Sequence, residues 1–128
     1  MGKELYGIKI LVVDDDADTR ELLEWVLKRT GAEVVLAASA REALEAMERS
    51  KPHVLVSDIA MPNGTGYDLV RQVRAMPALA RIPTIALTAY GRLEDRERAL
   101  TAGFNFHIVK PVEPLHLVNA IATAVGRA

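Results

Sequence analysis

Short apolar runs alternate along the chain with longer segments in which apolar residues recur every three or four positions among charged ones. The short runs are typical of buried strands, and the longer segments have the spacing of amphipathic helices. The pattern predicts five strands, at residues 8–13, 33–37, 53–57, 83–88 and 106–109. It predicts five helices, at residues 17–29, between Ser39 and Pro52, at 67–75, at 92–101 and from Pro114 onward.

The strands are apolar along their whole length, so both of their faces are expected to be buried. That pattern is typical of a parallel sheet covered by helices on each side. Right-handed crossovers between successive strands then give a doubly wound α/β fold. We expect a single domain over residues 1–128, with its core at about 7–125, because no repeat, linker or low-complexity segment interrupts the alternation.

Local signals predict how individual helices begin and which of their faces are buried. Asp16 is expected to cap the first helix, and Ser39 with Glu42 forms a capping-box pattern at the second. Trp25 lies off the apolar stripe of the first helix, where it either packs partly against neighbours or belongs to a docking surface. The residues expected to face the core are Leu22, Leu23 and Val26 in the first helix, Leu93, Ala99 and Leu100 in the fourth, and Leu115, Leu117, Val118 and Ile121 in the last.

Composition narrows the function classes. The formal net charge of −1 argues against direct nucleic-acid binding, which needs a basic face. The chain has no cysteine, which excludes disulfides and cysteine-ligated zinc and fits a cytoplasmic location. No apolar segment approaches the roughly 20 residues that a membrane-spanning helix requires, so we expect no membrane binding by the chain itself.

Polar residues follow four of the predicted strands directly. The carboxyl ends of parallel strands meet at one edge of the sheet, where doubly wound folds bind their ligands. We therefore expect several carboxylates, a hydroxyl and an ammonium group to converge there. These residues are Asp14, Asp15 and Asp16 after the first strand, Asp58 after the third, Thr88 after the fourth and Lys110 after the fifth.

Crowded carboxylates repel one another, by roughly 4 kcal/mol for two charges about 4 Å apart at an effective dielectric near 20. A Mg²⁺ ion, which prefers oxygen ligands, removes that repulsion and can bring a phosphoryl group to the same place. Each residue alone also has a simpler interpretation: Asp14 and Asp15 as helix caps, Thr88 as a turn residue and Lys110 as a solvated lysine. Their joint placement at strand ends favours metal and phosphoryl chemistry.

Over nearly its whole length the chain resembles the receiver domain of two-component response regulators, the CheY-like superfamily. The matching segments are Val12–Asp16, Ser57–Pro62, Leu87–Ala89 and Val109–Pro111, in this order and each at a strand end. The resemblance implies a flavodoxin-like sheet with strand order 2-1-3-4-5. The segments 86–96 and 103–112 are most similar to receivers of hybrid histidine kinases, which favours that origin over the alternative of a free-standing regulator.

The resemblance also implies a metal site and a phosphoacceptor. Asp58 would accept a phosphoryl group from a histidine kinase or a histidine phosphotransferase. Asp15 and Asp58 would bind Mg²⁺ directly, together with the backbone carbonyl of Ala60. Asp14 would act mainly through metal-bound water.

The resemblance implies further roles for residues of the last two strands. Lys110 would pair with Asp58 and then with its phosphoryl group, and the Lys110–Pro111 peptide bond would be cis. Thr88 would turn inward to bond a phosphoryl oxygen, and His107 occupies the position where the family commonly has a switching Tyr or Phe. His107 is therefore either a half-buried imidazole with one hydrogen bond or a switch residue with added pH sensitivity.

Two features predict how long the phosphoryl group would persist. Ala60, two residues after Asp58, has no side chain that can orient an attacking water, so we expect slow self-dephosphorylation. Tyr90, two residues after Thr88, can also shield the group. The helix at 92–101 is charge-rich with few apolar residues, and we expect it to shift readily on phosphorylation.

We interpret the chain as a signalling switch and not as an enzyme that acts on an external substrate. The sequence does not identify the downstream protein partner. One alternative is an aspartyl-phosphate phosphatase, but such enzymes need a second acid where this chain has Ala60. Another is a protein-binding module that works without phosphorylation. A flavodoxin-type cofactor module would need a loop rich in Ser, Thr and Gly after the first strand, and this loop is acidic.

Overall fold

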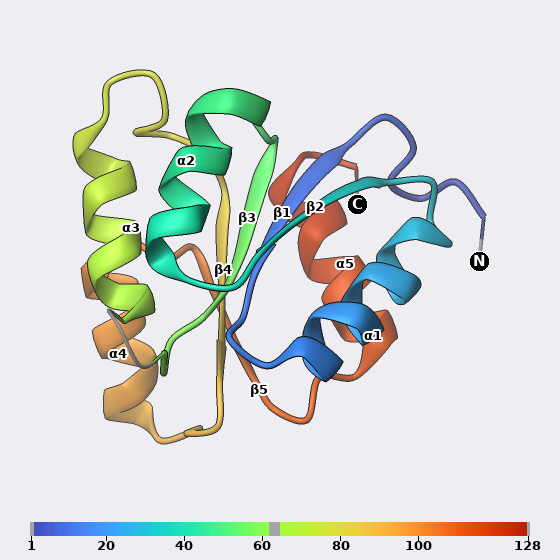
Figure 1. Cartoon of the computed structure of the whole chain (residues 1–128). Coiled ribbons are helices and arrows are strands. Elements are labelled where there is room, and N and C mark those ends of the chain that lie inside the picture. The colour runs from blue at the N-terminus through green and yellow to red at the C-terminus, as the bar shows by residue number, and fades with distance from the viewer. Residues whose placement is uncertain (1, 62–64, 128) are drawn as a thin grey trace.

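The computed structural model describes residues 2–61 and 65–127. Within them, strands and helices alternate strictly along the chain (Figure 1). The strands are β1 (Lys9–Val13), β2 (Glu33–Ala37), β3 (Val54–Asp58), β4 (Thr84–Thr88) and β5 (Phe106–Val109). The helices are α1 (Ala17–Lys28), α2 (Ala40–Ser50), α3 (Gly66–Ala75), α4 (Leu93–Ala102) and α5 (Pro114–Ala124).

The five strands form one parallel sheet in the order β2-β1-β3-β4-β5. Helices α1 and α5 cover one face of the sheet, and α2, α3 and α4 cover the other (Figure 1). The predicted doubly wound fold and its strand order are confirmed. In this topology the ends of β1 and β3 are neighbours in the middle of the sheet, which brings Asp14 and Asp58 to the same rim.

Side chains of β1 alternate between the two halves of the core. Ile10 and Val12 pack with α1 and α5, whereas Leu11 and Val13 pack with α2 and α3. All four are completely buried, and each such side chain stabilises the fold by about 1.5–3 kcal/mol. Burial on both faces explains why the strands are continuously apolar.

The predicted caps form, with one difference. The Asp16 carboxylate accepts a hydrogen bond from the Thr19 amide (3.2 Å), and the Ser39 hydroxyl accepts one from the Glu42 amide (3.2 Å). The Glu42 carboxylate, however, reaches the Ala38 amide at 3.4 Å rather than the Ser39 amide. The capping box at α2 is therefore only half closed.

Four leucines predicted to face the core are exposed. Leu22 of α1 is 56% exposed, and Leu27 is fully buried in its place. At 100° per residue, Leu22 lies roughly 90° from the centre of the stripe formed by Leu23, Val26 and Leu27. Trp25 lies farther round the helix and is 60% exposed, with the Arg29 guanidinium 4.6 Å from its ring centroid.

The other three exposed leucines belong to α4 and α5. Leu93 is 66% exposed and Leu115 is 54% exposed, and each lies in the first turn of its helix. Leu100 is also exposed, and α4 buries only two small residues, Ala99 and Ala102. Since α4 also lacks a side-chain cap at Arg92, it has few contacts to hold it in place.

The end of the sheet opposite the carboxylates is held by Arg74 of α3. Its guanidinium donates to the Gly103 carbonyl (2.7 and 2.9 Å), to the Thr84 hydroxyl (2.9 Å) and to the Asn105 side chain (2.9 Å). It also donates to the Ile82 carbonyl. One side chain thus connects α3 to the beginnings of β4 and β5. Across residues 2–61 and 65–127, no helix is long and apolar enough to cross a membrane.

We predict that Arg74→Lys lowers the free energy of unfolding by at least about 2 kcal/mol, because an ammonium group cannot replace the branched set of charged hydrogen bonds. Urea unfolding followed by circular dichroism measures this. Arg71→Lys on the same helix is the matched control, since Arg71 is exposed and has only a 3.5 Å contact with Asp68. Equal effects of the two substitutions would contradict the prediction.

Candidate functional site

The loop after β1 places one buried and one exposed carboxylate at the rim of the sheet. The Asp14 amide donates to the Ala37 carbonyl (3.1 Å), which extends the β1–β2 pairing past the end of the strand. The Asp14 side chain is fully buried, and its Oδ1 accepts from the Asp16 amide at 2.9 Å. Asp15 is exposed. Asp16 faces α1 as its cap, which leaves Asp14 and Asp15 for the rim.

Asp58 is the last residue of β3 and is only 5% exposed. The chain that follows folds back tightly, because the Gly66 amide donates to the Ile59 carbonyl at 2.8 Å. A Cβ atom at Gly66 would lie 2.5 Å from the Asp58 carbonyl oxygen, so only glycine fits there. The sequence analysis did not identify Gly66 as part of the site.

Lys110 joins the carboxylates of two other strands. Its Nζ lies 3.1 Å from Asp14 Oδ2 and 3.3 Å from Asp58 Oδ1. Its amide donates to the Thr88 carbonyl at 2.7 Å, and the Lys110–Pro111 peptide bond is cis, as the resemblance implies. The hydrogen bond to Asp14 was not foreseen, because the family pattern suggested Asp58 as the partner of the lysine.

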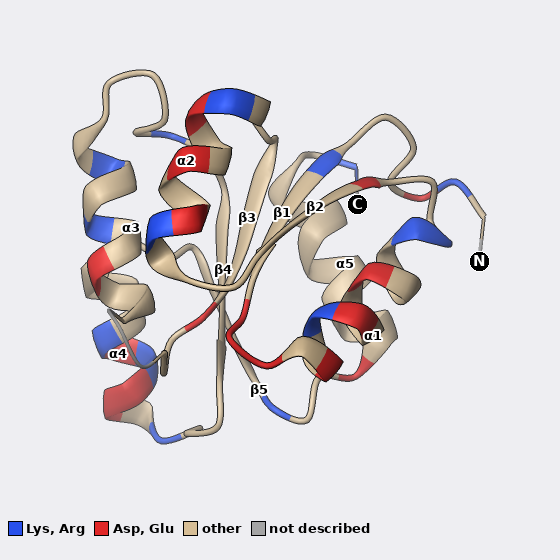
Figure 2. Cartoon of the chain, in the orientation of Figure 1, with Lys and Arg blue, Asp and Glu red and all other residues tan. Residues whose placement is uncertain are grey.

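Asp14, Asp15 and Asp58 each offer one carboxylate oxygen, and these oxygens lie within 4.8 Å of one another. Figure 2 shows the acidic segments after β1 and β3 side by side. Burial raises the pKa of Asp58, and the charge of Asp14 raises it further, while Lys110 opposes both effects. Burial alone would lower the Lys110 pKa, but the hydrogen bond and charge of Asp14 and the charge of Asp58 raise it overall.

Thr88 and Ala60 line a cavity beside the carboxylates. Leu87 is the β4 partner of Asp58, so Thr88 lies one residue beyond the acid; its side chain is 5% exposed. The Thr88 hydroxyl accepts a hydrogen bond from the Tyr90 amide at 3.0 Å. The cavity has a volume of about 290 Å³, and its walls also include Tyr67, Tyr90, Arg92, Asp95 and Arg98.

His107 lies away from the carboxylates, on the face of β5 that α4 covers. It pairs across the sheet with Ala86, which packs in the same apolar cluster as Ala99 of α4. The hydrogen bond expected for a half-buried imidazole is absent at Nε2, which is buried and has no partner within residues 2–61 and 65–127. No pattern in the sequence signals this unpaired nitrogen.

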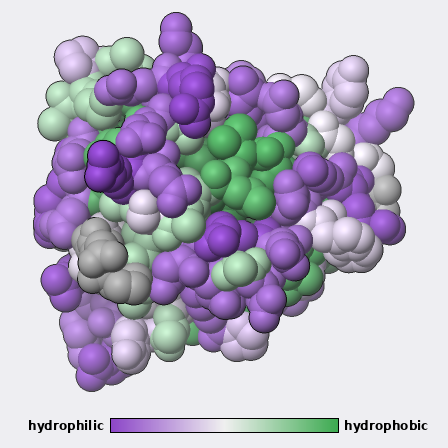
Figure 3. Space-filling view, in the orientation of Figure 1, coloured by the Kyte–Doolittle hydropathy of each residue, from purple (hydrophilic) through white to green (hydrophobic). Residues whose placement is uncertain are grey.

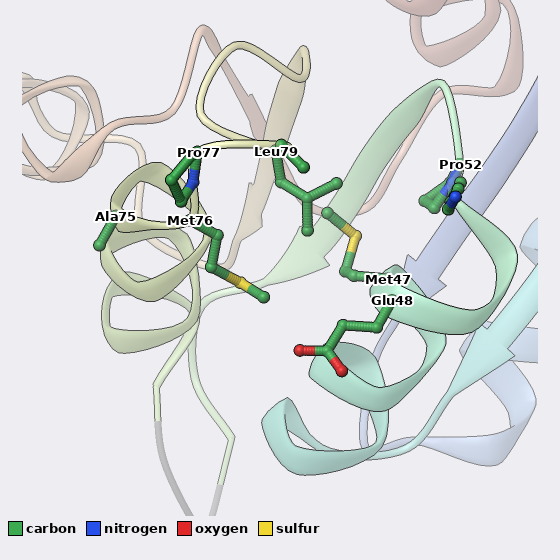
Figure 4. A pocket seen from close by; sticks show the side chains of 9 residues that line it. Met47, Glu48, Pro52, Ala75, Met76, Pro77 and Leu79 are labelled. Atoms are coloured by element: carbon green, nitrogen blue, oxygen red, sulfur yellow. The ribbon is translucent and has the colours of Figure 1, made fainter.

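A larger cavity lies at the opposite end of the sheet, between the end of α2 and the segment after α3. It has a volume of about 640 Å³ and is lined mainly by apolar groups, including Met47, Met76 and Leu79, with the Glu48 carboxylate at its edge (Figure 4). It contains none of the predicted site residues. A second apolar feature is the area over edge strand β2 in Figure 3, where Val34 and Val35 are partly buried.

Comparison with known proteins identifies the family. The model of the response regulator receiver domain matches residues 10–122. The chain belongs to this family. Its homologues include response regulators, and the receiver domain acts as a signalling module in two-component systems.

Three similar proteins illustrate the relationship. A 14.6 kDa protein from the sodA1 3′ region of Leptolyngbya boryana is 52% identical over 117 residues, 91% of this chain and 89% of that protein. The probable transcriptional regulator ycf27 of Cyanophora paradoxa is 39% identical over 124 residues, 97% of this chain and 51% of that protein, so the receiver spans about half of the regulator's length. The crystal structure of a putative response regulator from Chloroflexus aurantiacus has a TM-score of 0.89 at 37% identity, covering 94% of this chain and 98% of that one.

We predict that Asp58→Asn raises the free energy of unfolding at pH 7 in metal-free buffer. The raised pKa of Asp58 means that the folded state resists its ionisation, so the wild type loses stability as the pH rises through that pKa. The gain in the variant should therefore shrink as the pH falls below that pKa and vanish below the ordinary pKa of an Asp side chain, about 3.9.

Urea unfolding at several pH values in the presence of a chelator measures the difference. Asp15→Asn removes the same charge from an exposed position and should give a smaller gain. A variant less stable than the wild type at pH 7 would show that the pair with Lys110 outweighs desolvation and repulsion at Asp58.

Proposed function

We propose that the chain is a phosphoacceptor switch in a two-component phosphorelay. Asp58 accepts a phosphoryl group from a phosphohistidine on a histidine kinase or a histidine phosphotransferase. The observation that carries the proposal is the meeting of three carboxylate oxygens within 4.8 Å, with Lys110 Nζ 3.1 Å from Asp14 and 3.3 Å from Asp58. This arrangement combines a nucleophile with a fixed cation, as phosphoryl transfer requires.

The donor set fits Mg²⁺, because it consists of oxygen atoms at a partly exposed rim. Asp15, Asp58 and the backbone carbonyl of Ala60 would hold the ion directly, with Asp14 acting through water. When bound, the ion would neutralise the carboxylates and the phosphoryl oxygens. Its binding would also lower the pKa of Asp58 and so favour the ionised nucleophile.

Asp58, Lys110 and Thr88 each have a distinct role in the proposed phosphoryl transfer. An oxygen of the Asp58 carboxylate attacks phosphorus while the bond from phosphorus to the donor imidazole breaks and its electron pair returns to that nitrogen. Lys110 stabilises the charge on the phosphoryl oxygens. The Thr88 hydroxyl accepts from the Tyr90 amide and keeps its own proton free to donate to a phosphoryl oxygen.

Phosphorylation would act on partners through β4, α4 and β5. Movement of Thr88 toward the phosphoryl group changes the wall of the adjoining cavity, which α4 shares through Arg92 and Asp95. The proposal covers a free-standing regulator and the receiver of a hybrid histidine kinase, and in both settings the cytoplasm supplies Mg²⁺ and the donor. Its downstream partner is a protein, and direct contact with nucleic acid or membrane is not part of the proposal.

A phosphatase acting through an aspartyl phosphate is less well supported. Such an enzyme needs a second acid two residues after the nucleophile, and Ala60 supplies none. A binding module independent of phosphorylation would leave the buried carboxylate of Asp58 without a function. Two measurements distinguish the proposal from both alternatives: the residue to which a phosphoryl group becomes attached, and the lifetime of that attachment.

Incubation with Mg²⁺ and acetyl phosphate should add one phosphoryl group, which peptide mass spectrometry should place on Asp58. Omitting Mg²⁺, or substituting Asp15→Asn, should lower the rate at least about tenfold, because charge compensation is lost. Binding of Mg²⁺, followed by calorimetry, should weaken in the same variant.

Asp16→Asn is the matched control for these measurements. It removes one carboxylate from the same loop, preserves a good capping side chain and lies outside the carboxylate cluster. Its rate and its Mg²⁺ affinity should stay close to the wild type. Modification at another residue, or an equal loss in Asp16→Asn, would refute the proposed site.

We predict that Ala60→Asn shortens the lifetime of the phosphorylated protein by at least about tenfold, because an amide can position an attacking water. Ala60 is exposed and lines the 290 Å³ cavity, so a larger side chain has room there. The decay of the phosphorylated mass gives the lifetime.

Ala60→Val fills the same space without a hydrogen-bonding group and should not shorten the lifetime. Tyr90→Ala, measured in parallel, separates shielding by the 61% exposed Tyr90 from the effect of position 60. An unchanged lifetime in Ala60→Asn would remove the basis for slow self-dephosphorylation.

A further inference from the structure

The contact between α4 and β5 contains a buried polar atom without a partner. Nε2 of His107 is screened from solvent and makes no hydrogen bond to the described residues. A buried polar group left unsatisfied costs about 1–3 kcal/mol, so its retention in the seam between a strand and a helix calls for an explanation. A neutral imidazole is tolerated there, whereas a charged one without a partner would cost more.

The charged groups that act on this imidazole all belong to α4. Burial lowers the His107 pKa most strongly, Asp95 opposes that effect, and Arg96 adds to it. On the neighbouring strand, the residue paired with His107 is the uncharged Ala86. His107 is therefore neutral at pH 7, with one carboxylate near enough to attract it once it is protonated.

Asp95 is already engaged with another cation. Its Oδ2 lies 3.3 Å from Nε of Arg92, and its side chain is only 20% exposed. Arg92 also lies 3.8 Å from Glu94, which gives it an alternative partner. Since Arg92 and Asp95 both line the cavity that contains Thr88, an exchange of partners at Asp95 changes the wall of the phosphoacceptor site.

Few packing contacts of α4 oppose this exchange of ion-pair partners at Asp95. Helix α4 buries only Ala99 and Ala102, and no side chain caps its N-terminus. An element with so few buried contacts opens at a small cost in free energy. Few contacts therefore prevent α4 from moving when His107 becomes protonated.

We infer that protonation of His107 rearranges the packing of the first turn of α4 against β5, with Asp95 exchanging Arg92 for the imidazolium, so that the cavity beside Thr88 responds to mild acid as well as to phosphorylation. The pH response belongs to the unphosphorylated chain. Its consequence for signalling rests on the proposed phosphoacceptor function.

Proton linkage gives the direction of the pH effect on α4 opening and the pH range over which it occurs. In the rearranged state, which we call open, His107 pairs with Asp95 and its pKa is at least the ordinary value of about 6.5, whereas in the closed state burial lowers that pKa. Above both values neither state is protonated and pH has no effect. Between them only the open state binds a proton, so the opening constant should rise about tenfold for each unit that the pH falls.

Nuclear magnetic resonance tests the inference directly. Ring signals of the three histidines give their titration midpoints, and assignment uses His107→Phe. We expect His107 to titrate below 6.5. We also expect amide exchange in the first turn of α4, corrected for its intrinsic pH dependence, to rise by about tenfold per unit over the same window and to lose that dependence in His107→Phe.

A pair of α4 variants tests the role of Asp95. Asp95→Asn should lower the His107 midpoint further, because it removes the carboxylate that favours the imidazolium. Glu94→Gln, one residue away and also next to Arg92, should leave it unchanged. Equal shifts in the two variants would overturn the exchange of partners at Asp95.

Three results would overturn the inference itself: a His107 midpoint at or above 6.5, corrected exchange of α4 that is independent of pH, or the same pH dependence in His107→Phe. None of these measurements uses a phosphodonor or Mg²⁺. Failure of the pH response therefore leaves the phosphoacceptor proposal standing, and failure of phosphorylation at Asp58 leaves the pH response standing.

Discussion

The site depends on the bridge that the Lys110 ammonium makes between two buried carboxylates. Asp14 and Asp58 end neighbouring strands, and their charges would repel each other in a region that solvent barely reaches. Lys110, from the end of β5, neutralises part of that repulsion at 3.1 and 3.3 Å. The pKa of Asp58 nevertheless remains raised, because burial and the charge of Asp14 together outweigh Lys110. These costs at Asp58 support the proposed Mg²⁺ site, since a bound cation would offset them.

The sheet topology converts a scattered set of residues into this cluster. Residues 14 and 110 are 96 positions apart in the chain, yet parallel strands with helical crossovers end on the same edge. This explains why the fold class and the group of carboxylates with a lysine were accessible from the pattern of residues, whereas the strand order came from the resemblance to receiver domains. Continuous apolar runs identify central strands, and the polar residue that follows each run identifies the rim.

Other features could not be predicted from the sequence, because each depends on a local detail of the structure. The exposure of Leu22 depends on how α1 is rotated against the sheet, and apolar spacing alone leaves that rotation uncertain by about one residue. The need for glycine at position 66 comes from a backbone approach to Asp58, which leaves no pattern in the sequence. The second partner of Lys110 and the unpaired nitrogen of His107 depend on side-chain positions across three elements.

The network around Arg74 has a mechanical consequence for the whole sheet. It secures the starting ends of β4 and β5 through Thr84, Gly103 and Asn105, at the far end of the sheet from Thr88 and Lys110. The other ends of β4 and β5 lie under α4, which buries only Ala99 and Ala102 and has no side-chain cap. The same two strands are therefore held by charged hydrogen bonds where they begin and by much weaker packing where they reach the rim, so the starting ends should be the more resistant to rearrangement.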